Sequence, residues 1–115
     1  MYISRKDANT AQKFPLDFGD GKEYYLSVLS GFSDEFRQAK NTISTVIAVS
    51  DEKINQIDMV ERLLSSVIVD WKLPKDIKAG KCNPENAKKL LHEFPEICDK
   101  LNNFIAIKNN FIEKK

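Results

Sequence analysis

The sequence has few of the residues that build metal centres, disulfide frameworks and membrane spans. It contains one histidine, His92, and two cysteines, Cys82 and Cys98, without a Cys-x-x-Cys pair. A structural zinc site needs four such ligands, and small secreted scaffolds need more cysteines, so we expect no metal and no disulfide. No apolar run exceeds four residues, whereas a membrane-spanning helix needs about 20. We therefore expect a cytoplasmic protein that makes no contact with a membrane.

An excess of one charge is also absent. The 18 basic and 17 acidic side chains leave a net charge of +1, without the basic surplus that nucleic-acid binders usually carry. We therefore do not expect nucleic acid as a partner, although four lysines recur at every third position between Lys72 and Lys81. That segment, residues 72–82, also contains Pro74 and Gly80 and fits neither the helical nor the strand period, which indicates a solvated loop.

No set of residues in the sequence points to catalysis. A thiol is activated by a neighbouring imidazole, but nothing places Cys82 or Cys98 beside His92. Acidic pairs such as Asp34 and Glu35 occur at helix starts, where the helix dipole already explains them. The stretch of residues 19–21 is too short to hold a phosphate. We therefore expect no catalytic residue, no cofactor and no enzymatic activity.

The first regular pattern is a β-hairpin over residues 13–30. Apolar side chains alternate with others in two runs, which comprise Phe14, Leu16 and Phe18, and Tyr24, Leu26 and Val28. Between the runs, residues 19–22 supply the glycines that a reversal needs, and Pro15 suggests an edge strand. Residues 1–12 are polar and lack a period, so we expect them to be flexible.

Two helices are predicted over residues 33–71. Ser33 can cap the first helix, and Ser50, Asp51 and Glu52 repeat the same start signal. Apolar residues then follow at steps of three and four, at Ile57, Val60, Leu64, Val67 and Trp71. We interpret Trp71 as a core anchor at the end of the second helix. The competing interpretation is a surface aromatic that contacts a partner.

A second helical pair is predicted over residues 83–112, in which Asn83 caps the first helix, Pro84 opens it, and Pro95 separates it from the last helix. The chain of 115 residues is then a single domain of the α+β class, mainly α. Its N-terminal β-hairpin is followed by about four helices in two helical hairpins. With 42% hydrophobic residues, the chain can build one core.

The last helix shows an apolar arc of about 160°, wider than the stripe of about 100° that docking on a single core requires. One edge of the arc is therefore surplus, and we assign Phe104, Ile107 and Phe111 to a partner surface. The alternative is a helix wedged between two others, which would bury the whole arc.

The order of the motifs resembles one known family. The segment Ser33-Asp-Glu-Phe-Arg37 is followed by Val67-Ile-Val-Asp-Trp71, then by Pro84-Glu-Asn-Ala-Lys-Lys-Leu-Leu91, by Phe94-Pro95, and by a final Phe111. Over residues 12–112 this order is similar to that of the tail assembly chaperones of long-tailed bacteriophages. The chain differs from that family in its lysine-rich composition.

The resemblance implies a non-enzymatic function in the host cytoplasm. Proteins of that family bind the tape measure protein while the tail tube protein polymerises around it, and they are absent from the mature virion. In many of them a programmed frameshift adds a C-terminal extension that recruits the tube protein. The alternative is a small structural or DNA-associated regulatory protein of a phage or bacterium. The sequence leaves the oligomeric state open, and self-association is compatible with it.

Overall fold

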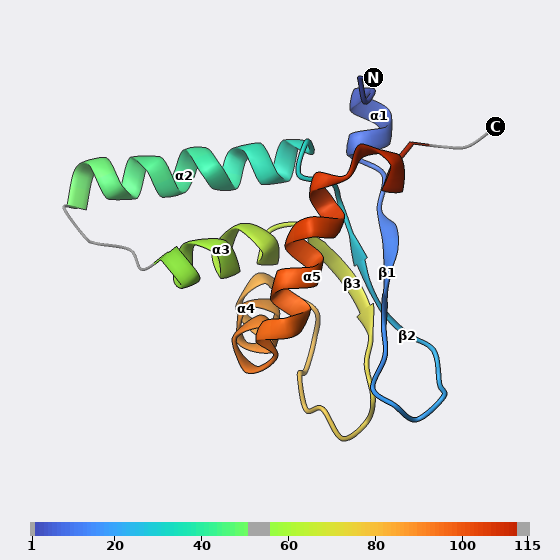
Figure 1. Ribbon diagram of the computed structural model, residues 1–115. Helices are drawn as coiled ribbons and strands as arrows, with labels where there is room; N and C mark the ends of the chain where they lie inside the picture. The colour runs from blue at the N-terminus through green and yellow to red at the C-terminus, as the bar shows by residue number, and fades with distance from the viewer. Residues whose placement is uncertain (1, 51–55, 113–115) are drawn as a thin grey trace.

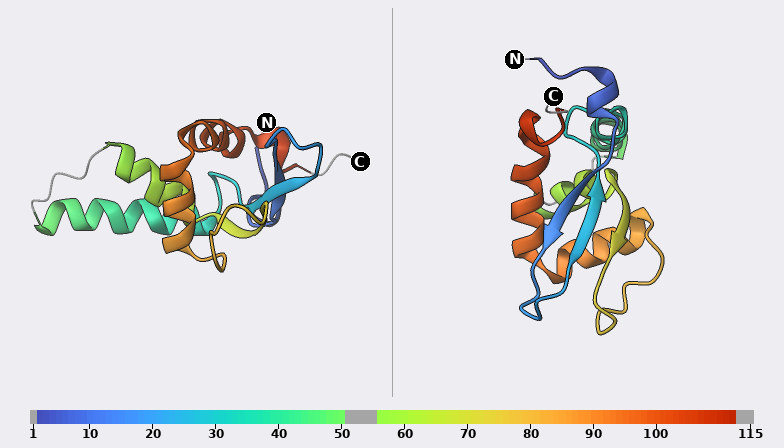
Figure 2. Two further views of the ribbon diagram at one scale, coloured as in Figure 1. Left: turned by 90° about the horizontal axis from the view of Figure 1, so that it is seen from below. Right: turned by 90° about the vertical axis from the view of Figure 1, so that its right-hand side faces the viewer.

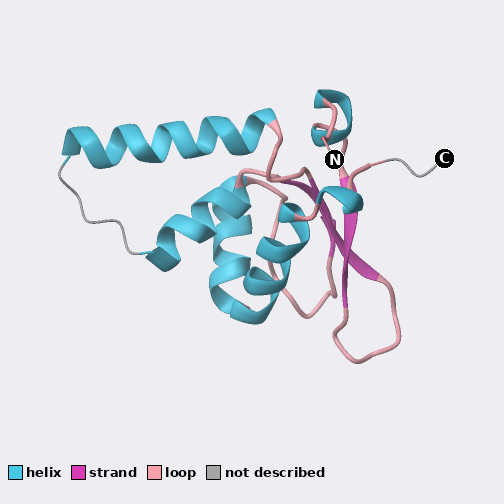
Figure 3. Ribbon diagram, turned by 45° about the horizontal axis from the view of Figure 1, so that its top comes forward, coloured by secondary structure: helices cyan, strands magenta, loops and turns pink. Residues whose placement is uncertain are grey.

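The computed structural model describes residues 2–50 and 56–112, which form one sheet with helices against it (Figure 1). In chain order the elements are α1 (Arg5–Ala8), β1 (Gln12–Leu16), β2 (Tyr24–Val28), α2 (Asp34–Ser50), α3 (Gln56–Ser65), β3 (Ile68–Lys72), α4 (Pro84–Glu93), α5 (Pro95–Ala106) and the short 3-10 helix η1 (Lys108–Asn110). More of the described residues lie in helices than in strands (Figure 3), so the predicted class, α+β and mainly α, is confirmed.

The sheet has three antiparallel strands in the order β1-β2-β3. Its register places Phe14 opposite Leu26, and Leu26 opposite Trp71, so these side chains share the inner face. The α3, α4 and α5 helices lie behind that face in Figure 2, whereas no described helix covers the other face. On this outer face the ammonium group of Lys13 lies 4.6 Å from the ring centre of Tyr25.

The predicted β-hairpin is confirmed, and its turn is held by two aspartates. Asp17 accepts a hydrogen bond from the Gly19 amide at 2.8 Å, and Asp20 accepts one from the Lys22 amide at 2.9 Å. Gly19 and Gly21 both adopt positive φ, at 80° and 75°, which a side chain would strain. Local chemistry in residues 17–22 therefore fixes the reversal that pairs β1 with β2.

The helix predicted to continue through Trp71 ends at Ser65, and this part of the prediction is wrong. Residues 68–72 instead form β3, which pairs with β2, and Lys72 closes the strand rather than opening the loop. Ile68 and Val69 are β-branched and favour strands, and a short apolar run satisfies both the helical and the strand period. Pairing with β2, which is distant in sequence, therefore determines that residues 68–72 form a strand and not a helix.

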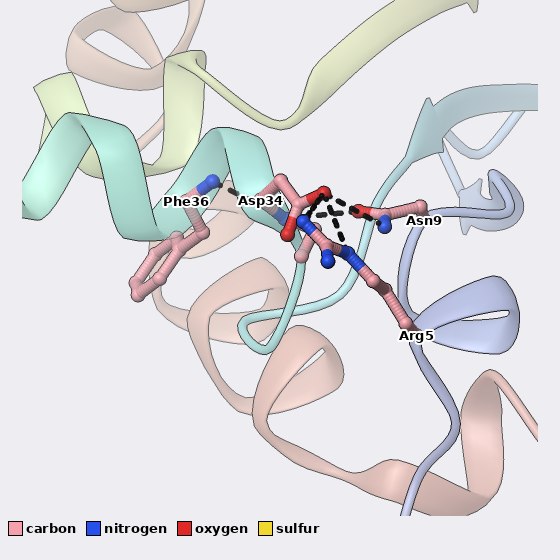
Figure 4. Close-up of polar contacts among 5 residues, drawn as sticks. Arg5, Asn9, Asp34 and Phe36 are labelled. Carbon is pink, nitrogen blue, oxygen red and sulfur yellow. Dashed lines mark hydrogen bonds and ion pairs between the residues drawn. The ribbon is translucent and has the colours of Figure 1, made fainter.

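The N-terminal segment, predicted to be flexible, contains α1 and is anchored to the start of α2 (Figure 4). Arg5 donates two hydrogen bonds to Asp34 Oδ2, at 3.2 and 3.1 Å, and Asn9 Nδ2 donates a third at 3.2 Å. The Asp34 amide donates to Asn9 Oδ1 at 2.9 Å. Ala8 is buried, and its carbonyl accepts from Ser30. Each of these contacts joins residues more than 20 positions apart in the sequence, so the polar composition of residues 1–12 could not indicate that the segment is anchored.

The helix ends follow the predicted capping residues. Ser33 Oγ accepts the Phe36 amide at 3.3 Å, and Asn83 Oδ1 accepts the Asn86 amide at 2.8 Å. Pro84 and Pro95 open α4 and α5, where a missing N–H removes no intrahelical bond. The predicted helix start at Asp51 and Glu52 lies outside the described residues.

The core lies between the inner face of the sheet and the α3, α4 and α5 helices. Most of its fully buried side chains come from β2, α3, α4 and α5, and these include Leu26, Val28, Leu64, Leu91 and Leu101. The α2 helix extends away from the sheet beside α3 (Figure 1). The corner between α4 and α5 lies against the hairpin end of the sheet, where Phe94 contacts Phe18, and the candidate site lies there.

Candidate partner-binding surface

Two of the three residues predicted to contact a partner, Phe104 and Phe111, belong to an edge-to-face aromatic cluster with Phe14. Phe104 lies 5.2 Å from Phe14 and 5.6 Å from Phe111 between ring centres, with edge-to-face geometry in both pairs. Phe111 is only 2% exposed, so its assignment to a surplus helix edge is wrong. The reason is that α5 ends at Ala106 and the chain turns through η1, which returns Phe111 to the core. Phe104 is partly buried in the same cluster.

Ile107 lies at the surface, as its assignment requires. It follows the last turn of α5 and is 51% exposed. The neighbouring Lys108 places its ammonium group 5.2 Å from the ring centre of the exposed Phe32. Ile107 is therefore the only residue of the predicted trio that a partner can reach without disturbing the core.

Trp71 packs against the core from β3, across from Leu26, and it remains partly exposed. Its amide donates a hydrogen bond to Asp70 Oδ1 at 2.9 Å. The side chain therefore has the predicted contact with the core, but it reaches that position from a strand instead of from a helix end.

A groove that the sequence did not reveal lies between the hairpin end of the sheet and the α4–α5 corner. It has a volume of about 390 Å³, and its apolar lining consists of Leu16, Phe18, Phe94, Pro95 and Ile97. The ring of Phe18 meets those of Tyr24 and Phe94 edge to face, with centroids 5.5 and 6.0 Å apart. The contact of Phe18 with Phe94 joins the two walls of the groove. Phe18 and Phe94 belong to separate motifs, so neither motif alone could indicate it.

The rim of this groove is acidic. Asp17 and Glu93 line it, and within residues 2–50 and 56–112 neither makes an ion pair. Glu96 also lines it and pairs with Lys100 at 3.0 Å, which largely cancels that charge. Because the rim carries two uncompensated carboxylates, the groove favours a cationic partner.

A second concavity, with a volume of about 710 Å³, lies between α3 and α4 and is lined by ion pairs. Glu61, 4% exposed, faces His92, whose Nδ1 lies 2.9 Å from Glu61 Oε2. Asp58 pairs with both Lys88 and Arg62, and these contacts lower the pKa of its carboxyl group, Lys88 contributing most. These ion pairs brace the two helices, and Glu93, which lines both this concavity and the groove, is the lining carboxylate without an ion pair among the described residues.

The two thiols are poor nucleophiles in their surroundings. Burial raises the pKa of Cys82, with a further contribution from Asp70, and burial also raises that of Cys98, with Glu61 and Asp99 adding to it. Both cysteines are free. In the described part of the chain no three His, Cys, Asp or Glu side chains are grouped so that they could hold a metal ion.

Comparisons with known protein families, with curated proteins and with solved structures found no match to this chain. Among the described helices, none combines the length and the apolar character that crossing a bilayer requires. The surface itself therefore carries the functional argument.

Proposed function

We propose that this protein is a tail assembly chaperone of a long-tailed phage. It binds the tape measure protein in the host cytoplasm, keeps that protein soluble while tail tube protein polymerises around it, and departs before the virion is complete. The proposal takes the identity of the partner from the resemblance between residues 12–112 and that chaperone family.

The observation that carries the proposal is the open apolar groove at the α4–α5 corner. Phe18, Phe94 and Ile97 are each partly exposed, and all three line this one groove. A groove of this kind suits a chain that buries apolar side chains on binding, which is the requirement of a chaperone for an aggregation-prone partner. Ile107 adds a second exposed apolar position at the other end of α5.

A polar small ligand fits the groove less well. Among the described residues no buried side-chain nitrogen or oxygen lacks a hydrogen-bond partner, so no inward-facing polar group is set aside for a ligand. Recognition there depends on apolar contact and on the rim charges, and both are features of protein association.

Co-expression with the tape measure protein encoded in the same genome tests the proposal. We expect the tape measure protein to be soluble when this chain is present and insoluble when an unrelated domain of similar size replaces it. The two proteins should then elute together in size-exclusion chromatography. Insoluble tape measure protein in both cases, or soluble protein without a complex, would contradict the proposed function.

A further inference from the structure

The groove between β1 and the α4–α5 corner has walls of two kinds. One wall is the end of β1 and the residues after it, from Phe14 to Phe18, and the other is the row Phe94, Ile97 and Lys100 along the start of α5. The second row follows helical spacing, which presents these side chains along one ridge. The strand wall therefore faces a helix ridge across the groove, and an occupant must fit between the two.

An added strand is a poor occupant for this cleft. β1 is an edge strand, and Pro15 stands in its middle, paired with Tyr25. Proline is tolerated in such a ladder where its missing N–H faces away from the neighbouring strand, so the free edge lacks a donor at that point. Beyond Leu16, Asp17 holds the Gly19 amide and turns the backbone away from an extended path. Pairing by backbone hydrogen bonds is thus interrupted on both sides of Leu16.

A helix of two turns matches the length of the strand wall. Four residue steps from Phe14 to Phe18 extend at most about 13 Å, and less where the backbone turns after Leu16, and two turns of α-helix extend about 11 Å. The apolar side chains at positions i, i+3 or i+4, and i+7 of such a helix all lie within that length. The groove can accept two or three of them against Leu16, Phe18, Phe94 and Ile97.

The negative charge of the groove rim favours a helix that carries positive side chains. Asp17 and Glu93 stand on opposite walls and have no ion-pair partner within the described residues. Lysine or arginine beside the apolar stripe of a bound helix would face these carboxylates, whereas an acidic helix would be repelled. The exposed carboxylates keep their water until contact, so they contribute chiefly to selectivity and association rate.

We propose that this groove binds two turns of an amphipathic helix whose apolar stripe is flanked by lysine or arginine. The inference deepens the proposed function and rests on it only in taking the occupant to be a segment of a protein chain. It names the recognised element, a basic amphipathic helix, and the residues that select it.

Designed peptides test this proposal with the full chain. The probe is a helical peptide of about 18 residues, with leucine at i, i+3 or i+4, and i+7, lysine on both sides of that stripe and alanine elsewhere, which is long enough and alanine-rich enough to form a helix in water. Two matched peptides replace the lysines by glutamates or the leucines by serines. In heteronuclear NMR titrations at low salt, we expect the leucine–lysine peptide to shift the amides of residues 14–18 and 93–100. Neither matched peptide should do so at the same concentration.

Two groove variants refine the test. Asp17→Asn with Glu93→Gln removes the rim charge and keeps the shape, and it should weaken binding of the leucine–lysine peptide about three- to tenfold at low salt. Ile97→Ser removes an apolar contact and should weaken it by about tenfold. The matched control, Glu35→Gln with Glu85→Gln, removes two exposed carboxylates that do not line the groove and should leave binding unchanged.

The outcomes separate this inference from the proposed function. Equal binding by the rim variant and the wild type, equal binding of the leucine–glutamate peptide, or shifts confined to other residues would overturn the inference. If the wild type keeps the tape measure protein soluble but binds no peptide in the groove, the inference fails and the proposed function stands. If the groove binds the basic peptide but the tape measure protein stays insoluble, the proposed function fails instead.

Discussion

Phe18 in the hairpin and Phe94 at the start of α5 meet edge to face, with ring centroids 6.0 Å apart. Their contact joins the hairpin to the corner between α4 and α5, and both rings line the groove. Edge-to-face aromatic pairs contribute about 0.5–1.5 kcal/mol beyond the area that they bury. The same pair lines the groove together with Pro95 and Ile97. The contact that holds the hairpin on the helices therefore also shapes the proposed binding surface.

Phe111 and Ile107 should respond differently to truncation. Phe111→Ala removes a buried ring that contacts Phe104, so we expect it to lower the free energy of unfolding by about 3–5 kcal/mol. Ile107→Ala alters an exposed side chain and should change it by about 0.5 kcal/mol or less. Urea denaturation of the two variants measures both values. Similar losses in both would contradict the placement of Phe111 in the core.

The sequence pattern predicts the side chains within α5 correctly but not those after Ala106, where α5 ends. The apolar period correctly identified Ile97, Leu101 and Ile105 as one helical side, because they all lie within α5. The same period failed beyond Ala106, since a helical projection assumes that the helix continues. The turn through η1 has no strong breaker such as proline or glycine, so the sequence offered little warning of it.

Trp71→Ala should lower the free energy of unfolding by about 1.5–3 kcal/mol, because the ring packs on the core but remains partly exposed. Val69→Ala is the matched control on the same strand. Val69 is 49% exposed, so its truncation should cost about 0.5 kcal/mol or less. A loss for Trp71→Ala no larger than that of the control would indicate a surface aromatic instead of a core contact.

The misassignment of residues 68–72 has a comparable physical cause. Leu64, Val67 and Trp71 fit the helical period, whereas β-branched residues at 67–69 fit a strand equally well. The strand is favoured over the helix because residues 68–72 can pair with the edge of β2 that β1 leaves open. That edge exists only once the hairpin has formed. The hairpin itself was predictable, since its alternation and its glycine turn are both local.

Arg5→Ala should release α1 from the start of α2 without unfolding the domain. It removes the ion pair with Asp34, which is exposed to solvent, and we expect a global loss of about 0.2–1 kcal/mol. Amide hydrogen exchange at Ala8 and Asn9 should accelerate severalfold, because these amides depend on α1 staying formed. Lys6→Ala, on the same helix, is the control and should leave their exchange unchanged. Unchanged exchange in Arg5→Ala would mean that Asn9 and Ser30 hold the segment alone.

The ion pairs of Asp58 predict a pH-dependent contribution to stability. Lys88 and Arg62 lower the pKa of Asp58 below its ordinary value of 3.8. A carboxyl group with a lowered folded-state pKa stabilises the fold at neutral pH, and this contribution disappears as the pH falls through that pKa. Asp58→Asn should therefore cost about 0.5–1 kcal/mol at pH 7, and the deficit should shrink as the pH falls below about 4.

Urea unfolding midpoints of the wild type and Asp58→Asn, compared across this pH range, measure the effect. Asp99→Asn is the control, because Asp99 is an exposed carboxylate for which the described residues provide no ion pair. A deficit for Asp58→Asn that stays constant from pH 7 to about pH 3 would rule out the linkage.

The most direct test of the account is the amount of tape measure protein kept soluble by groove variants on co-expression. We predict that Ile97→Ser and the pair Asp17→Asn with Glu93→Gln each lower the soluble fraction severalfold, although both variants remain folded. Val69→Ser, which changes an exposed apolar residue of β3 that does not line the groove, should match the wild type. Wild-type solubility with both groove variants, or an equal loss with Val69→Ser, would contradict a chaperone that acts through this groove.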